Sequence, residues 1–279
     1  MSIVKDLHNL RGDRHKSLCL IKQNKELLLS EKKKMAKNNY TLKLDDTLKR
    51  IGGNNIITPK FDNIESLGLN DGEVFVVGNS VGFFDGHEDV SLKGSWTKTA
   101  NEQGARMPIV KDHEYKVDNL FAKNVQTVVK SLPIRALGYN ADGETEVIGA
   151  IINPYNELDY QKYIDGTIKK HSMGLQYIKI ALAINDDEFP EEKQNYDFYS
   201  QQVINKEAME EVGYFWAIQE QKALELSAVV LPSNPFTPAF TGKSLLNEPL
   251  NSTQTEPQKN TLDNKEPIKS SFYRKLIYS

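Results

Sequence analysis

The chain of 279 residues contains a single cysteine, Cys19, so no disulfide can form within it. The sequence also has no CxxC pair and no cysteine–histidine spacing of the zinc-binding type. A lone thiol is typical of proteins that stay in a reducing, intracellular compartment. From these absences we predict neither a metal site nor a cofactor.

Long apolar runs are absent as well. No stretch approaches the roughly 20 residues that a membrane-spanning helix needs, and the N-terminus lacks an apolar segment followed by a small-residue cleavage site. The net charge is only −3, which favours no polyanionic partner. We therefore expect a soluble, unexported protein that binds neither nucleic acid nor membrane.

The charge that is present is distributed unevenly. Residues 1–50 hold 13 lysines and arginines against 6 acidic residues, and we interpret them as a basic N-terminal arm, helical or disordered. It could instead be a removable pro-segment or a docking arm, and Met35 is an alternative start.

From residue 239 to 279 the chain is rich in Asn, Thr, Pro, Gln, Lys and Glu, which predicts a disordered tail. The main domain then spans residues 51–238.

Within that domain, apolar segments bounded by Gly, Asn, Asp or Pro predict six strands. They cover residues 72–84, 106–112, 145–153, 172–185, 213–221 and 223–232. Helical periodicity predicts helices at residues 117–132 and 156–170, and a start with Pro and Glu predicts a third helix at 190–212. The expected fold class is α+β, a mainly antiparallel β-barrel with helices inserted between strands and flexible termini.

One pair of adjacent residues, His171 and Ser172, raises the question of catalysis. A serine nucleophile needs a base within about 2.6–3.2 Å of its hydroxyl. Successive side chains on a strand point to opposite faces, so His171 is a poor base for Ser172. The base must come from a distant segment. His87 lies in an acidic turn, and His113 follows the apolar run "MPIV" where a strand should end.

Four blocks of the sequence, spanning residues 73–238, together resemble the prohead proteases of tailed bacteriophages. These are serine peptidases with a herpesvirus-assemblin-like barrel. The blocks are "VFVVGNSVGFFDGHEDVSLKGSW", "MPIVKDHEY", "GTIKKHSMGLQY" and "ALELSAVVLPSNPFTP". The resemblance implies that Ser172 is the nucleophile, His113 the base and Glu225 the acidic third member. Ser-x-Gly motifs are common, so the order of the blocks carries the resemblance.

The sequence departs from the family pattern in two places. A long segment separates His113 from Ile148 and Gly149, and a second one, roughly residues 186–211, separates Ser172 from Glu225. We expect both to be helical excursions, which cost little if they leave and return at neighbouring points. The second insertion leaves the assignment of Glu225 open.

The resemblance implies a serine endopeptidase of phage prohead maturation. It would act in the host cytoplasm, inside the assembling procapsid, on scaffold and major capsid protein, and would also cleave itself; self-association is a further expectation. The alternative is a catalytically inactive capsid-assembly or scaffold protein that retains the fold. A third interpretation is a plain binding module, in which Ser172 and His113 are ordinary polar residues.

Overall fold

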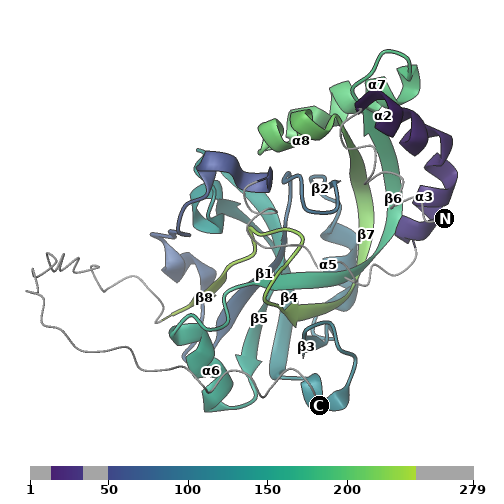
Figure 1. The fold of residues 1–279 in the computed structure, drawn as a ribbon. Helices are drawn as coiled ribbons and strands as arrows, with labels where there is room; N and C mark the ends of the chain where they lie inside the picture. The colour runs from purple at the N-terminus through teal and green to yellow at the C-terminus, as the bar shows by residue number, and fades with distance from the viewer. Residues whose placement is uncertain (1–13, 34–49, 243–279) are drawn as a thin grey trace, which may run out of the picture. The chain divides into compact units, whose positions relative to one another are not determined.

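Strands dominate the part of the chain that the computed structural model describes, residues 14–33 and 50–242 (Figure 1). The strands are β1 Val74–Ser80, β2 Asp89–Ser91, β3 Ile109–Lys111, β4 Ala122–Pro133, β5 Glu144–Pro154, β6 His171–Ile184, β7 Tyr214–Ala228 and β8 Ala239–Thr241.

Six α-helices and five short 3-10 helices that lie wholly within the described residues connect or flank these strands, and residues 50–52 are helical as well. The α-helices are α2 Arg14–Gln23, α3 Lys25–Lys33, α5 Thr97–Gln103, α6 Glu157–Ile164, α7 Pro190–Tyr199 and α8 Lys206–Val212. The 3-10 helices are η1 Gly53–Asn55, η2 Ile64–Leu67, η3 Val117–Asn119, η4 Ile134–Leu137 and η5 Ser200–Gln202.

The strands form two sheets. The first has the order β4-β5-β1-β8 with antiparallel pairs throughout. In the second, β7 pairs in parallel with the short strands β2 and β3 and antiparallel with the long strand β6. The chain is therefore mixed α and β, as expected. Neither sheet closes into a barrel among the described residues, so the expected barrel is not confirmed.

Alternating side chains bury both faces of β1, which lies inside the first sheet. Val74 and Val76 pack in one apolar cluster with Met173 of β6 and Leu226 of β7. Phe75 and Val77 pack on the other face, in a second cluster. The first cluster joins the two sheets and so fixes β6 and β7 against β1.

Close approach between the sheets depends on Gly78 of β1. A Cβ at this position would overlap Leu226 Cδ1 and would lie 2.6 Å from Met173 Cε. The absence of a side chain therefore lets β1 cross close to the β6–β7 pair. The next strand residue, Asn79, faces the pocket described below.

The predicted helix at 117–132 is wrong, because β4 occupies most of this segment. Its β-branched residues suit a strand, and ten positions of β4 pair with β5 from Ala122 to Pro133. This pairing overrides the helical spacing of the apolar residues. The insertion after His113 is thus a strand of the first sheet.

Other predictions agree more closely with the structure. The predicted strands at 213–221 and 223–232 are one continuous strand, β7, since neither Gly nor Pro interrupts residues 214–228. The predicted helix at 190–212 divides into α7, η5 and α8, and α6 covers only the first half of 156–170. The first three residues of the predicted tail form β8.

The two N-terminal helices pack onto the domain. Leu18 and Ile21 of α2 are 2% and 1% exposed and join the cluster between the sheets. Lys22 and Lys25 both bind Glu192 of α7, with Nζ–Oε1 distances of 2.6 and 2.8 Å. Figure 1 shows α2 and α3 alongside β6, with α2 close to α7.

Several sequence predictions concern residues outside the described part of the chain. These are the first 13 residues, the segment 34–49 with Met35, and the tail from 243 to 279. Within the described ranges, none of the helices has the length and apolar character needed to cross a membrane.

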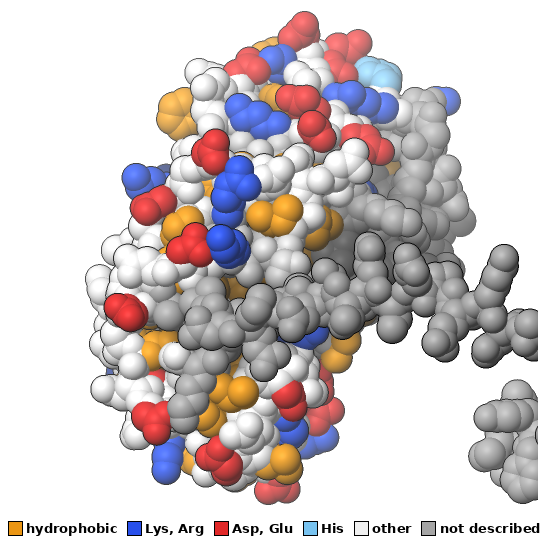
Figure 2. Space-filling model, turned by 90° about the vertical axis from the view of Figure 1, so that its left-hand side faces the viewer, with side chains coloured by type: hydrophobic (Ala, Val, Ile, Leu, Met, Phe, Trp, Pro, Cys, Tyr) orange, Lys and Arg blue, Asp and Glu red, His pale blue; other side chains and the backbone are white. Residues whose placement is uncertain are grey.

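Figure 2 shows acidic and basic side chains interspersed on the face it views, with scattered apolar ones between them.

Candidate functional site

A strained turn at the end of β3 presents His113. Asp112 and His113 both have left-handed backbones, with φ of 53° and 56°, and Glu114 N donates to Lys111 O across the turn. Such a conformation costs a non-glycine residue of the order of 1–3 kcal/mol and persists only where surrounding contacts enforce it. Here Asp112 N donates to Ala228 O and His113 N donates to Ser227 Oγ at 2.9 Å, which ties the turn to β7.

The ring of His113 contacts the carboxylate of Glu225. The distance from His113 Nδ1 to Glu225 Oε1 is 2.5 Å, and the Glu225 side chain is fully buried on β7. The other carboxylate oxygen, Oε2, has no hydrogen-bond partner among the described residues. A buried carboxylate is costly unless it is paired, so the imidazole is the group that compensates it. Two of the three predicted catalytic residues are therefore in direct contact.

Ser172 lies on the same face of the β6–β7 pair. It pairs with Ser227, whose hydroxyl accepts the bond from His113 N, and Gly174 pairs with Glu225. Paired residues of neighbouring strands project to the same side, as do residues two apart on one strand. Ser172, Glu225 and the His113 turn thus converge on one face although β3, β6 and β7 are far apart in sequence.

The space over Gly174 is filled by Glu225. A Cβ on Gly174 would overlap Glu225 Oε1 and lie 2.8 Å from its Cδ. Because glycine leaves this volume open, the carboxylate can lie over β6 and still reach His113. The Ser-x-Gly pattern therefore has a physical function here: the serine projects from the strand, and the glycine admits the acid.

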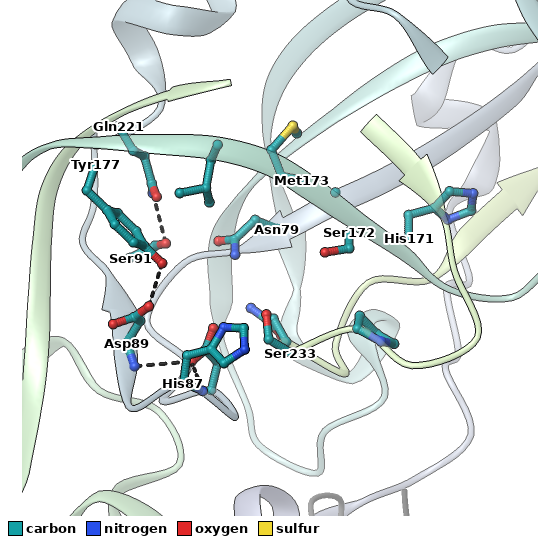
Figure 3. A pocket seen from close by; sticks show the side chains of 15 residues that line it. Asn79, His87, Asp89, Ser91, His171, Ser172, Met173, Tyr177, Gln221 and Ser233 are labelled. Carbon is teal, nitrogen blue, oxygen red and sulfur yellow. Dashed lines mark hydrogen bonds between the residues drawn. The ribbon is translucent and has the colours of Figure 1, made fainter. Parts of the chain in front are cut away.

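A small pocket, open to solvent, borders Ser172 (Figure 3). Asp89, Ser91 and Tyr177 lie at one end of it, and Ser172 and His171 lie at the other. Its other lining residues are Gly78, Asn79, Asp85, His87, Met173, Leu175, Gln221, Pro232, Ser233 and Asn234. Of the three predicted catalytic residues, Ser172 is the one in this lining.

The segment after β7 forms one wall of the pocket and is firmly held. Asn234 Nδ2 donates to Ser80 O at 2.9 Å, and the Ser80 hydroxyl donates to Phe236 O. Thr237 Oγ1 donates to His171 O at 2.7 Å. These contacts fix the wall against β1 and against the residue next to Ser172, so the surroundings of Ser172 are preorganised.

His171 makes its ring contact with α6. Its Nε2 lies 3.0 Å from the hydroxyl of Tyr163, and the two rings stack at 5.7 Å between centroids. Burial, followed by the nearby charge of Lys170, lowers the pKa of His171 to about 3. A neutral, enclosed imidazole facing Tyr163 suits a packing role.

Sequence reasoning missed several polar residues of this region. Ser227 supports the His113 turn, and its only sequence signal is the pattern acid, apolar, Ser in "ELS". Asp85 and Asp89, which flank His87 in the acidic turn, line the pocket and are 7% and 4% exposed. These two acids are four positions apart, and the sequence could have indicated them only if it had predicted that this turn is buried.

Comparisons with protein-family models, with curated proteins and with solved structures give no match.

Proposed function

We propose that the chain is a serine endopeptidase of bacteriophage prohead maturation, with Ser172 as nucleophile, His113 as general base and Glu225 as the residue that orients the base. The observation that carries the proposal is the 2.5 Å contact between His113 Nδ1 and Glu225 Oε1 on the face where Ser172 projects. In this proposal the two sheets represent an open variant of the assemblin-like barrel.

The proposed mechanism is acyl transfer. With Nδ1 held by Glu225, Nε2 is the imidazole nitrogen that takes the Ser172 proton as the serine oxygen attacks a peptide carbonyl. The same nitrogen then returns the proton to the leaving amine. Glu225 selects this tautomer and stabilises the imidazolium that forms between the two steps. The strained turn contributes by holding the imidazole in place before substrate arrives.

The runner-up function is a catalytically inactive capsid-assembly protein that keeps the fold. The burial of the nucleophile favours it, since Ser172 is only 5% exposed. An active protease must admit an extended peptide to that hydroxyl, so the pocket wall or the His113 turn would have to move. The inactive alternative requires no such movement.

A fluorophosphonate probe distinguishes the two functions. The full chain is incubated with the probe, and the labelled peptide is mapped by mass spectrometry. A protease of the proposed type is labelled at Ser172, and the label is lost in His113→Ala. An inactive assembly protein gives no label at Ser172 above the level of a denatured control.

The substrates we propose are phage scaffold and major capsid protein, cleaved in the assembling procapsid, together with the chain itself. Self-cleavage is tested by intact-mass measurement of the wild type and Ser172→Ala after expression. A shorter product in the wild type alone supports it, whereas equal full-length masses contradict it. Size-exclusion chromatography with light scattering tests the proposed self-association.

A further inference from the structure

Three side chains on one turn can supply ligands to a cation. The turn between β1 and β2 carries Asp85, His87 and Asp89, and one potential ligand atom from each lies within 4.8 Å of the others. The turn is rigid, because Asp85 Oδ1 accepts the backbone N–H groups of His87 and Asp89 at 2.8 and 3.1 Å. These hydrogen bonds alone would be found in an ordinary turn and do not by themselves indicate a cation site.

A side chain from a different strand supplies the independent observation. Gln221 of β7 is 2% exposed, and its Nε2 donates to the hydroxyls of Ser91 and Ser95 at 2.8 and 3.1 Å. Its Oε1 is enclosed and accepts no hydrogen bond from any described residue. Leaving a buried amide oxygen without a partner costs about 1–3 kcal/mol.

Gln221 reaches into the same pocket as the turn. It pairs with Tyr177 of β6, so the two side chains project to the same side. The Tyr177 hydroxyl donates to Asp89 Oδ2 at 2.5 Å, while Gln221 binds Ser91, two residues farther along β2 (Figure 3). Gln221 and the acidic turn therefore line the same pocket.

The size of the pocket restricts the ligand. The whole pocket that the acidic turn shares with Ser172 offers a volume of about 20 Å³ to water-sized particles. A single water needs roughly 10–15 Å³ on this measure, so the space holds one or two small particles and not a side chain. An ion with its remaining water ligand fits.

The charge balance favours a cation over water alone. Two buried carboxylates face one ammonium group, Lys32 Nζ, which lies 2.5 Å from Asp89 Oδ1. Among the described residues no lysine or arginine forms an ion pair with Asp85.

We propose that Asp85, His87, Asp89 and Gln221 Oε1 bind a divalent cation of the Mn²⁺ or Zn²⁺ type. Three oxygen donors with one imidazole nitrogen suit these ions better than Ca²⁺ or Mg²⁺, which prefer oxygen alone. The cation would join the turn to β7 and fix the far end of the pocket that Ser172 borders. This site departs from the sequence analysis, which predicted no metal.

Lys32 gives the proposal a second consequence. Its ammonium already binds Asp89, so it repels an adjacent divalent ion and competes with it for that carboxylate. The lysine side chain is 21% exposed and can turn outward into water. Replacing Lys32 by a neutral residue should therefore strengthen metal binding.

Titration calorimetry of the full chain with MnCl₂ and with ZnCl₂ tests the site, with Mn²⁺ electron paramagnetic resonance as a second readout. The wild type should bind one ion, Asp85→Asn should weaken binding at least about 100-fold, and Lys32→Gln should tighten it. Asp142→Asn, an exposed acid elsewhere, is the matched control and should bind as the wild type does.

Circular dichroism checks that each variant folds. If Asp85→Asn does not fold, His87→Gln replaces it, and the same loss of affinity is expected. The proposal is overturned if the wild type binds neither ion at millimolar concentration, or if Asp85→Asn, or His87→Gln in its place, binds as tightly as Asp142→Asn. These readouts do not depend on peptidase activity, so they are independent of the proposed function.

Discussion

The carboxylate of Glu225 occupies the volume in which a side chain at position 174 would lie. A Cβ on Gly174 would overlap Oε1 and would come within 2.8 and 2.9 Å of Cδ and Cγ of Glu225. The same carboxylate contacts His113 Nδ1 at 2.5 Å. The absence of a side chain on β6 therefore determines whether the acid can support the histidine.

Replacing Gly174 by Ala should displace Glu225 from His113. Overpacking of this kind costs about 1–3 kcal/mol of folding free energy. We expect labelling of Ser172 by a fluorophosphonate to slow at least about 100-fold while the chain remains folded. The measurement is the labelling rate, with thermal unfolding recorded in parallel.

Gly78→Ala serves as the control for Gly174→Ala. It crowds Met173 and Leu226 on β6 and β7 and should destabilise the chain by a similar amount. Because it does not press on the Glu225 carboxylate, it should slow labelling less. Equal slowing in both variants would mean that Gly174 acts through stability alone.

Catalytic effects of the three residues should not add. Glu225→Gln replaces the carboxylate by a neutral amide, which neither fixes the tautomer of His113 nor stabilises its charged form, and we expect peptide cleavage to fall about 10³–10⁴-fold. Once Ser172 is replaced by Ala, further loss of His113 should change the residual rate little, since the residues act as one unit. The test compares the cleavage rates of Ser172→Ala, of His113→Ala and of the Ser172→Ala/His113→Ala double variant. Additive losses would contradict a shared mechanism.

Relief of backbone strain at Asp112 should stabilise the fold. Its φ of 53° lies in the left-handed region, where glycine is unstrained. We expect Asp112→Gly to raise the free energy of unfolding by about 0.5–1 kcal/mol, the strain relief exceeding the entropy cost of glycine. Urea denaturation measures this. Asn124→Gly, at φ 52° in the β4 bulge, is the matched control.

The two glycine variants should differ in their effect on the site. Both should gain stability, but only Asp112→Gly loosens the turn that presents His113, so only it should lower the labelling rate of Ser172. A loss of stability in Asp112→Gly would show that its side chain contributes more than its strained backbone costs.

Much of the strand pattern could be predicted because β-branched runs end at turn residues in this sequence. The β4 segment could not be, since its apolar residues fit a helical period and only pairing with β5 decides the outcome. The sequence also could not predict that the two sheets stay open, because closure of a sheet into a barrel depends on strand register and twist, which a single sequence does not specify.

The candidate site was predictable only in part. Ser172, His113 and Glu225 came from the order of four motifs, and the structure brings their strands together. Gln221 gave no signal, because it lies in a strand and its importance comes from an enclosed amide oxygen. The N-terminal helices were likewise ambiguous, as their polar surface hides the burial of Leu18 and Ile21.

Removing the lysines that bind Glu192 should unfold or detach the N-terminal helices. Burial alone would raise the pKa of Glu192, but hydrogen bonds and charge from Lys22 and Lys25 outweigh it and keep the pKa below its usual value. The Glu192 side chain is fully buried, so the Lys22→Met/Lys25→Met variant leaves its charge without a partner. The free energy of unfolding should fall by about 3–5 kcal/mol. Either single variant should lose less. Urea denaturation and limited proteolysis of residues 14–33 provide the measurements.

Acid should destabilise the chain through His171. The folded-state pKa is about 3 and the ordinary value is 6.5, so the unfolded chain binds a proton below pH 6.5 that the folded chain does not. Stability is then complete above pH 6.5 and falls as the pH drops, by up to about 1.4 kcal/mol per pH unit. His171→Gln, which cannot take up this proton, should show a shallower decline. Urea denaturation at pH 7, 6 and 5 compares the two slopes, and parallel slopes would show that His171 does not control the acid transition.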